Sequence, residues 1–227
     1  MQHLLLLHGA IGSSVQMIPL ANALKDRYII HTPDLPGHGS NAMTESFDMQ
    51  LLTAFVKDYI LSNNLQEACV FGYSMGGYIA LLLAKEEPSL VKKIITLATK
   101  FHWDEETAAK ESRMLDPSVI EEKLPQFAKT LKGRHSQNDW RQLLGHTAVM
   151  LEGLGKHNLL KPEDYKAIDK PVMVMLGDRD KMVSLDETVA VSKMMSSSSL
   201  AILPQTPHPI EAAPVDLLAF MVTHFLQ

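Results

Sequence analysis

The sequence predicts an α/β protein in which helices cover both faces of a parallel sheet. Short apolar runs, typical of buried strands, alternate along the chain with longer segments whose apolar residues recur at helical spacing. Glycine and proline, which favour turns, separate these segments. Because parallel strands all end at one edge of their sheet, we expect the functional loops to gather at that edge.

The first half of the chain follows this alternation closely. Ser14 follows a glycine-rich loop and is a candidate cap for the first helix, and Ser46 or Asp48 is expected to begin the second. In order, the expected elements are a strand at 3–8, a helix at 15–26, a strand at 28–32, a helix through Tyr59, a strand at 68–71, a helix at 78–84 and a strand at 91–98.

The alternation breaks after the strand at 91–98. Residues 102–166 contain helical pieces with polar faces and no convincing strand, which predicts a helical insertion between two parts of one core, residues 1–101 and 167–227. The core pattern then resumes with a strand at 171–177, a helix at 186–195, a strand at 200–203 and a helix at 214–225.

The turn at residues 72–76 carries the strongest functional signal. Gly72-Tyr73-Ser74-Met75-Gly76 fits G-x-S-x-G, in which a serine lies on a sharp turn between a strand and a helix. The glycines two positions before and after the serine are needed because a Cβ would clash where the backbone folds back on itself. An apolar run precedes the turn and a helical segment follows it, as the motif requires. We therefore predict that Ser74 is a nucleophile.

Two later loops carry the residues that could activate this serine. A serine hydroxyl needs a base, and the base needs an orienting group. His208 comes from the loop after the last expected strand, and the proline that follows it favours an extended, rigidly presented backbone. Asp178 and Asp180 both follow the preceding strand; Asp180 lies further out and can turn toward His208, whereas Asp178 is expected to serve the turn. The predicted triad is Ser74, His208 and Asp180.

An acyl-transfer site also needs donors for a developing oxyanion. One backbone N–H is expected from Met75, which directly follows the nucleophile at the start of a helix. The other is expected from Ala10, because the preceding Gly9 permits close approach of the backbone. His8 is expected to be a structural loop residue rather than a second base.

Composition and charge limit the kinds of partner and the location that we expect for this protein. The net charge is −5 and no basic block appears, so we expect no nucleic acid partner. The apolar runs are too short to span a bilayer, and the first residues run directly into a strand without a basic segment, so we expect neither a membrane partner nor a secretory signal. Cys69 is the single cysteine and lies in an expected buried strand, which favours a reducing compartment and hence a cytoplasmic location.

With these residues the chain resembles the α/β-hydrolase superfamily, in its single-domain serine hydrolase and esterase branch. The resemblance covers nearly the whole chain outside the insertion. The motifs that carry it, in the family's order, are His8-Gly9-Ala10, Asp34-Leu35-Pro36-Gly37-His38-Gly39-Ser40, the turn at Ser74, the loop at 177–180 and His208. The resemblance implies that residues 102–166 form a cap over the active site and that Asp180 and His208 complete the triad.

The chain also departs from the family pattern. Members commonly have two more strands before the one that ends at His8, so the resemblance implies a trimmed sheet of about six parallel strands, with the strand at 28–32 near an edge. The serine nucleophile excludes the branches that use aspartate, namely haloalkane dehalogenases and soluble epoxide hydrolases.

Three functional hypotheses follow. The first is a serine hydrolase that cleaves an ester or related acyl bond of a small molecule, needs no cofactor or metal, and leaves the oligomeric state open. Its acyl pocket is expected beneath the cap; the candidate wall residues, for each of which packing within the cap is an equal alternative, are Phe101, Trp103, Trp140 and Met150. The second is a lyase similar to the menaquinone-pathway enzyme that eliminates pyruvate, although Tyr78 replaces the arginine usual after the two glycines. The third is a ligand receptor on the same fold.

Overall fold

Six parallel strands form a single sheet in the order β2-β1-β3-β4-β5-β6. The computed structural model describes all residues from Met1 to Gln227. The strands are β1 (Gln2–Leu7), β2 (Tyr28–His31), β3 (Ala68–Tyr73), β4 (Val91–Leu97), β5 (Val172–Gly177) and β6 (Ser198–Leu203). The predicted parallel sheet of about six strands is confirmed, and β2 lies at an edge as expected.

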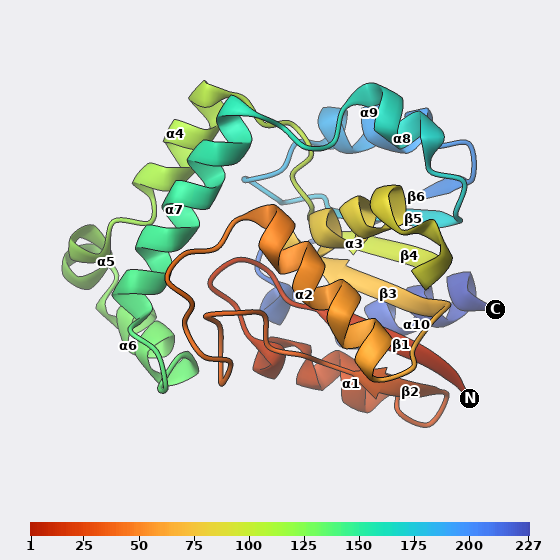
Figure 1. Ribbon diagram of the computed structural model, residues 1–227, viewed down its shortest axis with the longest axis horizontal. Coiled ribbons are helices and arrows are strands. Elements are labelled where there is room, and N and C mark those ends of the chain that lie inside the picture. The colour runs from red at the N-terminus through yellow and green to blue at the C-terminus, as the bar shows by residue number, and fades with distance from the viewer.

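Helices cover both faces of this sheet (Figure 1). One face is covered by α2 (Met49–Ser62), α3 (Met75–Glu86) and α9 (Leu185–Met194), and the other by α1 (Ile18–Leu24) and α10 (Val215–Leu226). Alternate residues of β1 divide between the two cores: Leu5 and Leu7 pack under α2 and α3, whereas Leu4 and Leu6 pack with α1 and α10. The continuous apolar run of a strand buried on both faces therefore has a direct structural cause.

The segment between β4 and β5 contains helices and connecting loops but no strand. It contains α4 (Glu105–Arg113), α5 (Pro117–Lys123), α6 (Pro125–Arg134), α7 (Trp140–Lys156) and α8 (Pro162–Ala167). Figure 1 shows α4 to α7 as a separate group beside the edge of the sheet where the strands end, while α8 lies with α9 over the core. None of the helices combines the length and apolar composition that crossing a membrane requires.

Helix starts follow the sequence signals with one exception. Asp48 caps α2, its Oδ1 accepting the N–H of Leu51 at 2.8 Å. The prediction that Ser14 caps the first helix is wrong: Ser14 is the first residue of a short 3-10 helix, η1 (Ser14–Met17), which Ser13 precedes, and Met17 stands at the N-cap position of α1. Two further short 3-10 helices are η2 (Pro88–Leu90) and η3 (Ile210–Ala212).

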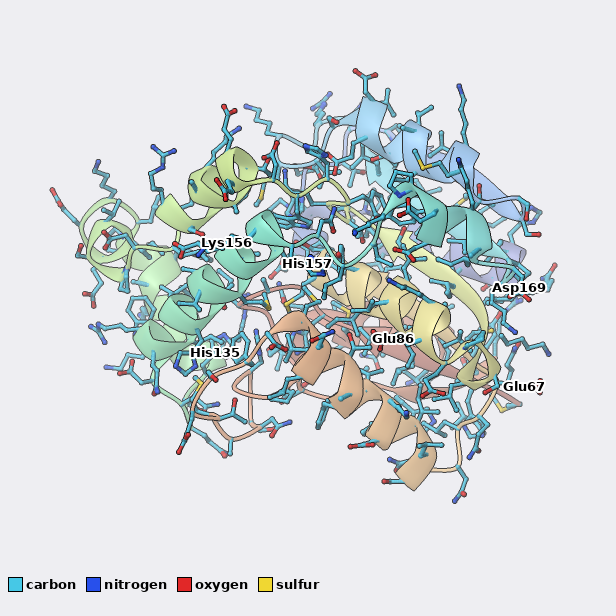
Figure 2. The ribbon with its side chains drawn as sticks, turned by 45° about the horizontal axis from the view of Figure 1, so that its top comes forward. Glu67, Glu86, His135, Lys156, His157 and Asp169 are labelled. Carbon is cyan, nitrogen blue, oxygen red and sulfur yellow. The ribbon has the colours of Figure 1, made fainter.

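Three fully buried histidines, His8, His38 and His135, join the α4–α7 group to the core. His135 follows the last residue of α6 (Figure 2). It accepts the N–H of Gly39 on Nδ1 at 2.9 Å and donates from Nε2 to the carbonyl of Ile11 at 3.0 Å. His8 accepts the N–H of Leu35 on Nε2 at 3.1 Å and lies against the ring of His38, with centroids 5.0 Å apart. His8 donates from Nδ1 to the carbonyl of Gly9 at 2.8 Å, and His38 donates from Nδ1 to the carbonyl of Pro36 at 2.9 Å. His8 and His135 each use one ring nitrogen as a donor and the other as an acceptor, so both rings are neutral.

Burial makes this cluster sensitive to acid. Burial lowers the pKa of His8 to about 4, lowers the pKa of His38 well below its usual value, and lowers the pKa of His135 as well. Below about pH 6.5 the unfolded chain binds protons on these rings that the folded chain does not bind. Stability present above that pH is therefore lost as the pH falls toward 4.

We expect the free energy of unfolding, measured in urea, to fall as the pH is lowered from about 7.5 to about 5.5, with about 1 kcal/mol of the fall due to His8. His38→Phe, which keeps an aromatic ring beside Phe47 but cannot take up a proton in the unfolded chain, should make this fall smaller. An unfolding free energy that stays constant over this interval would contradict the assignment of neutral buried rings.

Candidate active site

Ser74 lies on the sharp turn that its sequence motif predicts. It follows β3 directly and precedes α3, with φ 51° and ψ −116°, a left-handed φ that residues other than glycine rarely adopt. A Cβ on Gly72 would come within 2.3 Å of the Gly76 carbonyl oxygen, and one on Gly76 within 2.5 Å of the Leu7 carbonyl oxygen. Only glycine therefore fits at either position.

Hydrogen bonds hold the strained turn in place. The N–H of Ser74 donates to the carbonyl of Leu97 at 2.8 Å, and the Thr99 hydroxyl donates to the carbonyl of Ser74 at 3.0 Å. Both partners belong to the neighbouring strand β4 or to the residues just after it. Strain at a residue fixed by its surroundings in this way is typical of a functional site.

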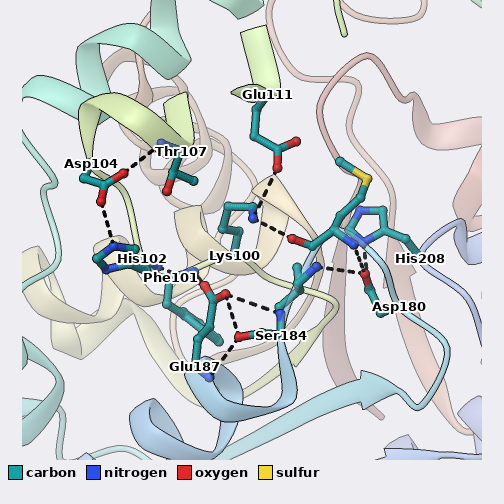
Figure 3. A network of polar contacts seen from close by, with 12 residues as sticks. Lys100, Phe101, His102, Asp104, Thr107, Glu111, Asp180, Ser184, Glu187 and His208 are labelled. Carbon is teal, nitrogen blue, oxygen red and sulfur yellow. Dashed lines mark hydrogen bonds and ion pairs between the residues drawn. The ribbon is translucent and has the colours of Figure 1, made fainter. Parts of the chain in front are cut away.

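Asp180 and His208 meet beside this turn. His208 Nδ1 lies 2.8 Å from Asp180 Oδ2, and the Asp180 side chain has no exposed surface. The other carboxylate oxygen, Oδ1, accepts the N–H groups of Met182 at 2.8 Å and Val183 at 2.9 Å. The carboxylate is thus fixed by the backbone of its own loop and turned toward the imidazole, as Figure 3 shows.

The electrostatics of this pair favour an ionised carboxylate. Burial acts to raise the pKa of Asp180, but the hydrogen bond from His208 and those from Val183 and Met182 outweigh it, and the net pKa is lowered. An ionised acceptor at this position makes His208 carry its proton on Nδ1, which leaves Nε2 free to accept one.

Asp178, the other candidate for the acid of the triad, makes a contact with the backbone of a neighbouring loop. Its Oδ1 accepts the backbone N–H of Thr206 at 3.2 Å, which ties the loop after β5 to the loop that carries His208. His8 is likewise structural, since it is fully buried and both of its ring nitrogens are bonded to nearby backbone, at Gly9 and Leu35.

Ser74 and His208 line one small cavity of about 80 Å³. No hydrogen bond joins the Ser74 hydroxyl to the imidazole in this structure, so catalysis would require that contact to close when substrate binds. The remaining wall is mostly apolar. It is formed by Ala10, Met49, Met75, Tyr78, Lys100, Trp103, Glu111, Leu151, Met182 and Val183.

The predicted oxyanion donors lie at the same cavity. The N–H of Ala10 donates to no other atom of the chain. Met75 is the first residue of α3, where a backbone N–H has no acceptor within the helix. A Cβ placed on Gly9 would lie 3.1 Å from the Ser74 Cβ, which shows how close this loop comes to the serine.

The four predicted wall residues divide unevenly. Trp103 lines the cavity, but Phe101, Trp140 and Met150 do not. Phe101 is buried against the ring of Tyr165, with centroids 6.0 Å apart. Trp140 packs among α5, α6 and α7, and Met150 lies on a separate hollow next to α2. Trp140 therefore packs within residues 102–166, which was the alternative considered for it, whereas Phe101 and Met150 pack against the core of the protein.

A charged pair in the wall was not predicted. Lys100 Nζ lies 3.2 Å from Glu111 Oε1 and donates to the carbonyl of Met182 at 2.5 Å (Figure 3). The side chains are only 16% and 6% exposed. A single feature of the sequence indicated that Lys100 could belong to the site. It closely follows a strand, at the edge of the sheet where the functional loops gather.

Comparison with known proteins identifies the class. The model of the alpha/beta hydrolase fold family matches residues 2–152, more than half of the chain, and the chain therefore belongs to this family of hydrolases.

The chain is similar over nearly its whole length to several named proteins. It is 23% identical to the uncharacterized hydrolase YugF of Bacillus subtilis, covering 100% of this chain and 90% of that protein. It is 27% identical to a pimeloyl-[acyl-carrier protein] methyl ester esterase of Chromobacterium violaceum, covering 89% and 83%. The structure of a thermophilic esterase from Thermogutta terrifontis superposes with a TM-score of 0.82 at 16% identity, covering 100% and 89%.

Proposed function

We propose that this protein is a serine hydrolase that cleaves the ester bond of a small molecule through Ser74, His208 and Asp180. The observation that carries the proposal is a single cavity at which Ser74 and His208 meet, with a buried carboxylate bonded to the far side of the imidazole. The esterase names of the relatives agree with this activity.

In the proposed reaction the Ser74 oxygen attacks the ester carbonyl while His208 Nε2 takes the hydroxyl proton. The N–H groups of Ala10 and Met75 bind the oxyanion, and each such donor is worth about 3 kcal/mol in the transition state. His208 then protonates the leaving alcohol. Water, deprotonated by the same imidazole, releases the acid from the acyl-enzyme.

We further propose that residues 102–166 act as the cap of this site. Trp103, Glu111 and Leu151 come from this segment and line the cavity opposite the serine turn. The buried contacts of His135 with Ile11 and Gly39 attach the segment to the loop that carries Ala10. The cap would thus control both the size of the cavity and the position of an oxyanion donor.

The cavity favours a short acyl group. Its volume of about 80 Å³ is well below the roughly 300–1,000 Å³ of pockets that enclose drug-sized ligands. With p-nitrophenyl esters of increasing length, we expect kcat/KM to be highest for acyl groups of about two to five carbons and to fall at least about tenfold by octanoate.

Leu151→Ala, which removes apolar bulk from the cavity wall, should move this optimum to longer chains. A preference for octanoate in the unaltered protein would contradict the size limit, and no turnover of any ester would contradict the proposed function.

The lyase alternative has less support. Its characteristic arginine is replaced by Tyr78, whose hydroxyl donates to Asn158 and accepts the N–H groups of Leu159 and Leu160. The Tyr78 side chain lines the cavity and carries no positive charge that could bind an anionic substrate.

A further inference from the structure

The Lys100–Glu111 pair is an unusual component of a small apolar cavity. Removing two charges from water costs about as much as their attraction returns, so stability alone is a weak reason to bury such a pair. Pockets that bind small molecules are mainly apolar and hold a few polar groups that orient the ligand. Besides Ser74 and His208, three side chains of the wall carry polar groups that could orient a ligand, those of Lys100, Glu111 and Trp103. The Tyr78 hydroxyl could not, because it is already bonded to Asn158, Leu159 and Leu160.

The unused groups are hydrogen-bond donors. The Lys100 ammonium has three N–H groups, of which two are taken by Glu111 and the carbonyl of Met182. The indole Nε1–H of Trp103 is buried and has no partner. A buried donor without an acceptor costs free energy, and a ligand oxygen toward which the Trp103 side chain turns would satisfy it.

The charge of the pair limits what that ligand group can be. Glu111 offsets the positive charge of Lys100, and its own carboxylate lies at the same wall of the cavity. A ligand carboxylate would be repelled by Glu111, whereas an uncharged carbonyl oxygen accepts hydrogen bonds without adding charge.

We infer that the preferred substrate is an ester whose acyl group carries a second, uncharged carbonyl oxygen, such as a ketone, bound by Lys100 and Trp103. This inference rests on the proposed function and deepens it, because it assigns Lys100, Trp103 and Glu111 as specificity-determining residues. Lys100 also holds the backbone of Met182, next to the Asp180 loop, so a change at Lys100 alone can alter turnover of every ester.

The ratio of kcat/KM for two substrates separates recognition of the ketone oxygen from a general effect of Lys100 on turnover. We would measure kcat/KM for p-nitrophenyl 4-oxopentanoate and for p-nitrophenyl pentanoate, which differ only in that a ketone carbonyl replaces the CH2 group at carbon 4, with uncatalysed hydrolysis subtracted. We expect the keto ester to be preferred about tenfold by the unaltered protein. Trp103→Phe should reduce the ratio severalfold, and the paired substitution Lys100→Met with Glu111→Leu should bring it close to one. Ser197→Ala, an exposed control outside the cavity wall, should leave it unchanged.

The effect of the Glu111 charge on ligand choice can be measured separately. Glu111→Gln leaves the Lys100 charge unopposed, so monomethyl glutarate should inhibit hydrolysis of p-nitrophenyl butyrate about tenfold more strongly in this variant than in the unaltered protein. Neutral methyl pentanoate should inhibit both proteins equally.

The possible failures are distinguishable. If both p-nitrophenyl esters are hydrolysed with equal kcat/KM by the unaltered protein, the inference is wrong and the proposed function stands. If neither ester is hydrolysed, the proposed function itself is wrong. The ratio in the unaltered protein and in Trp103→Phe decides the matter even if the paired substitution does not fold.

Discussion

Ser74→Ala is expected to lower the turnover of p-nitrophenyl butyrate by ~10⁴-fold or more. The substitution removes the oxygen that would form the acyl-enzyme, and His208 and the oxyanion donors cannot replace it. Residual hydrolysis should persist at about 10³–10⁴ times the uncatalysed rate, because the Ala10 and Met75 N–H groups would still bind the developing oxyanion.

Folding should be almost unaffected by this change. Ser74 makes its structural hydrogen bonds through backbone atoms, which an alanine at the same position would keep. The left-handed φ of 51° is no more strained for alanine than for serine. The unfolding midpoint in urea should therefore match that of the unaltered protein. Ser197→Ala, at an exposed position, is the matched control and should retain full turnover. Loss of less than about tenfold at Ser74 would contradict the assignment of the nucleophile.

Asp180→Asn is expected to lower kcat by ~10⁴-fold near neutral pH. The carboxylate accepts the proton that His208 carries on Nδ1. An amide at that position can instead donate to Nδ1, so the imidazole adopts the tautomer with its proton on Nε2 and cannot accept the serine proton. The side-chain oxygen of asparagine can keep the bonds from Met182 and Val183, so the loop should hold its shape.

Asp178→Asn is the matched control for this loss. The same substitution is made two residues earlier in the loop, at an aspartate whose Oδ1 accepts only the N–H of Thr206. Asparagine retains such an oxygen, so kcat should change by less than about threefold. Equal losses in the two variants would mean that the loop, rather than the Asp180 carboxylate, was disturbed.

The sheet and the serine turn were predictable because their signals are local. A strand segment buried on both faces must be apolar, as residues 4–7 of β1 and the whole of β3 are, and the turn at Ser74 leaves room only for glycine at positions 72 and 76. The choice between Asp178 and Asp180 also followed from their order along one loop.

The wall of the cavity could not be predicted in the same way. Trp103 and Trp140 have the same side chain, yet one lines the cavity and the other fills an interface among α5, α6 and α7. Which of them does so depends on how the helices pack. From the sequence, the Lys100 side chain would be expected to be exposed to solvent. Its burial depends on the ion pair with Glu111, and Glu111 lies beside it only because of where α4 packs.

The most direct measurement of the central claim is the mass of the intact protein after reaction with a fluorophosphonate. An activated serine attacks the phosphorus and displaces fluoride, which leaves one covalent adduct. We expect one adduct per chain, located on Ser74 by peptide mapping, and none after prior denaturation or in Ser74→Ala. A folded protein that gains no adduct, or that gains it on another residue while Ser74 stays unmodified, would contradict the account.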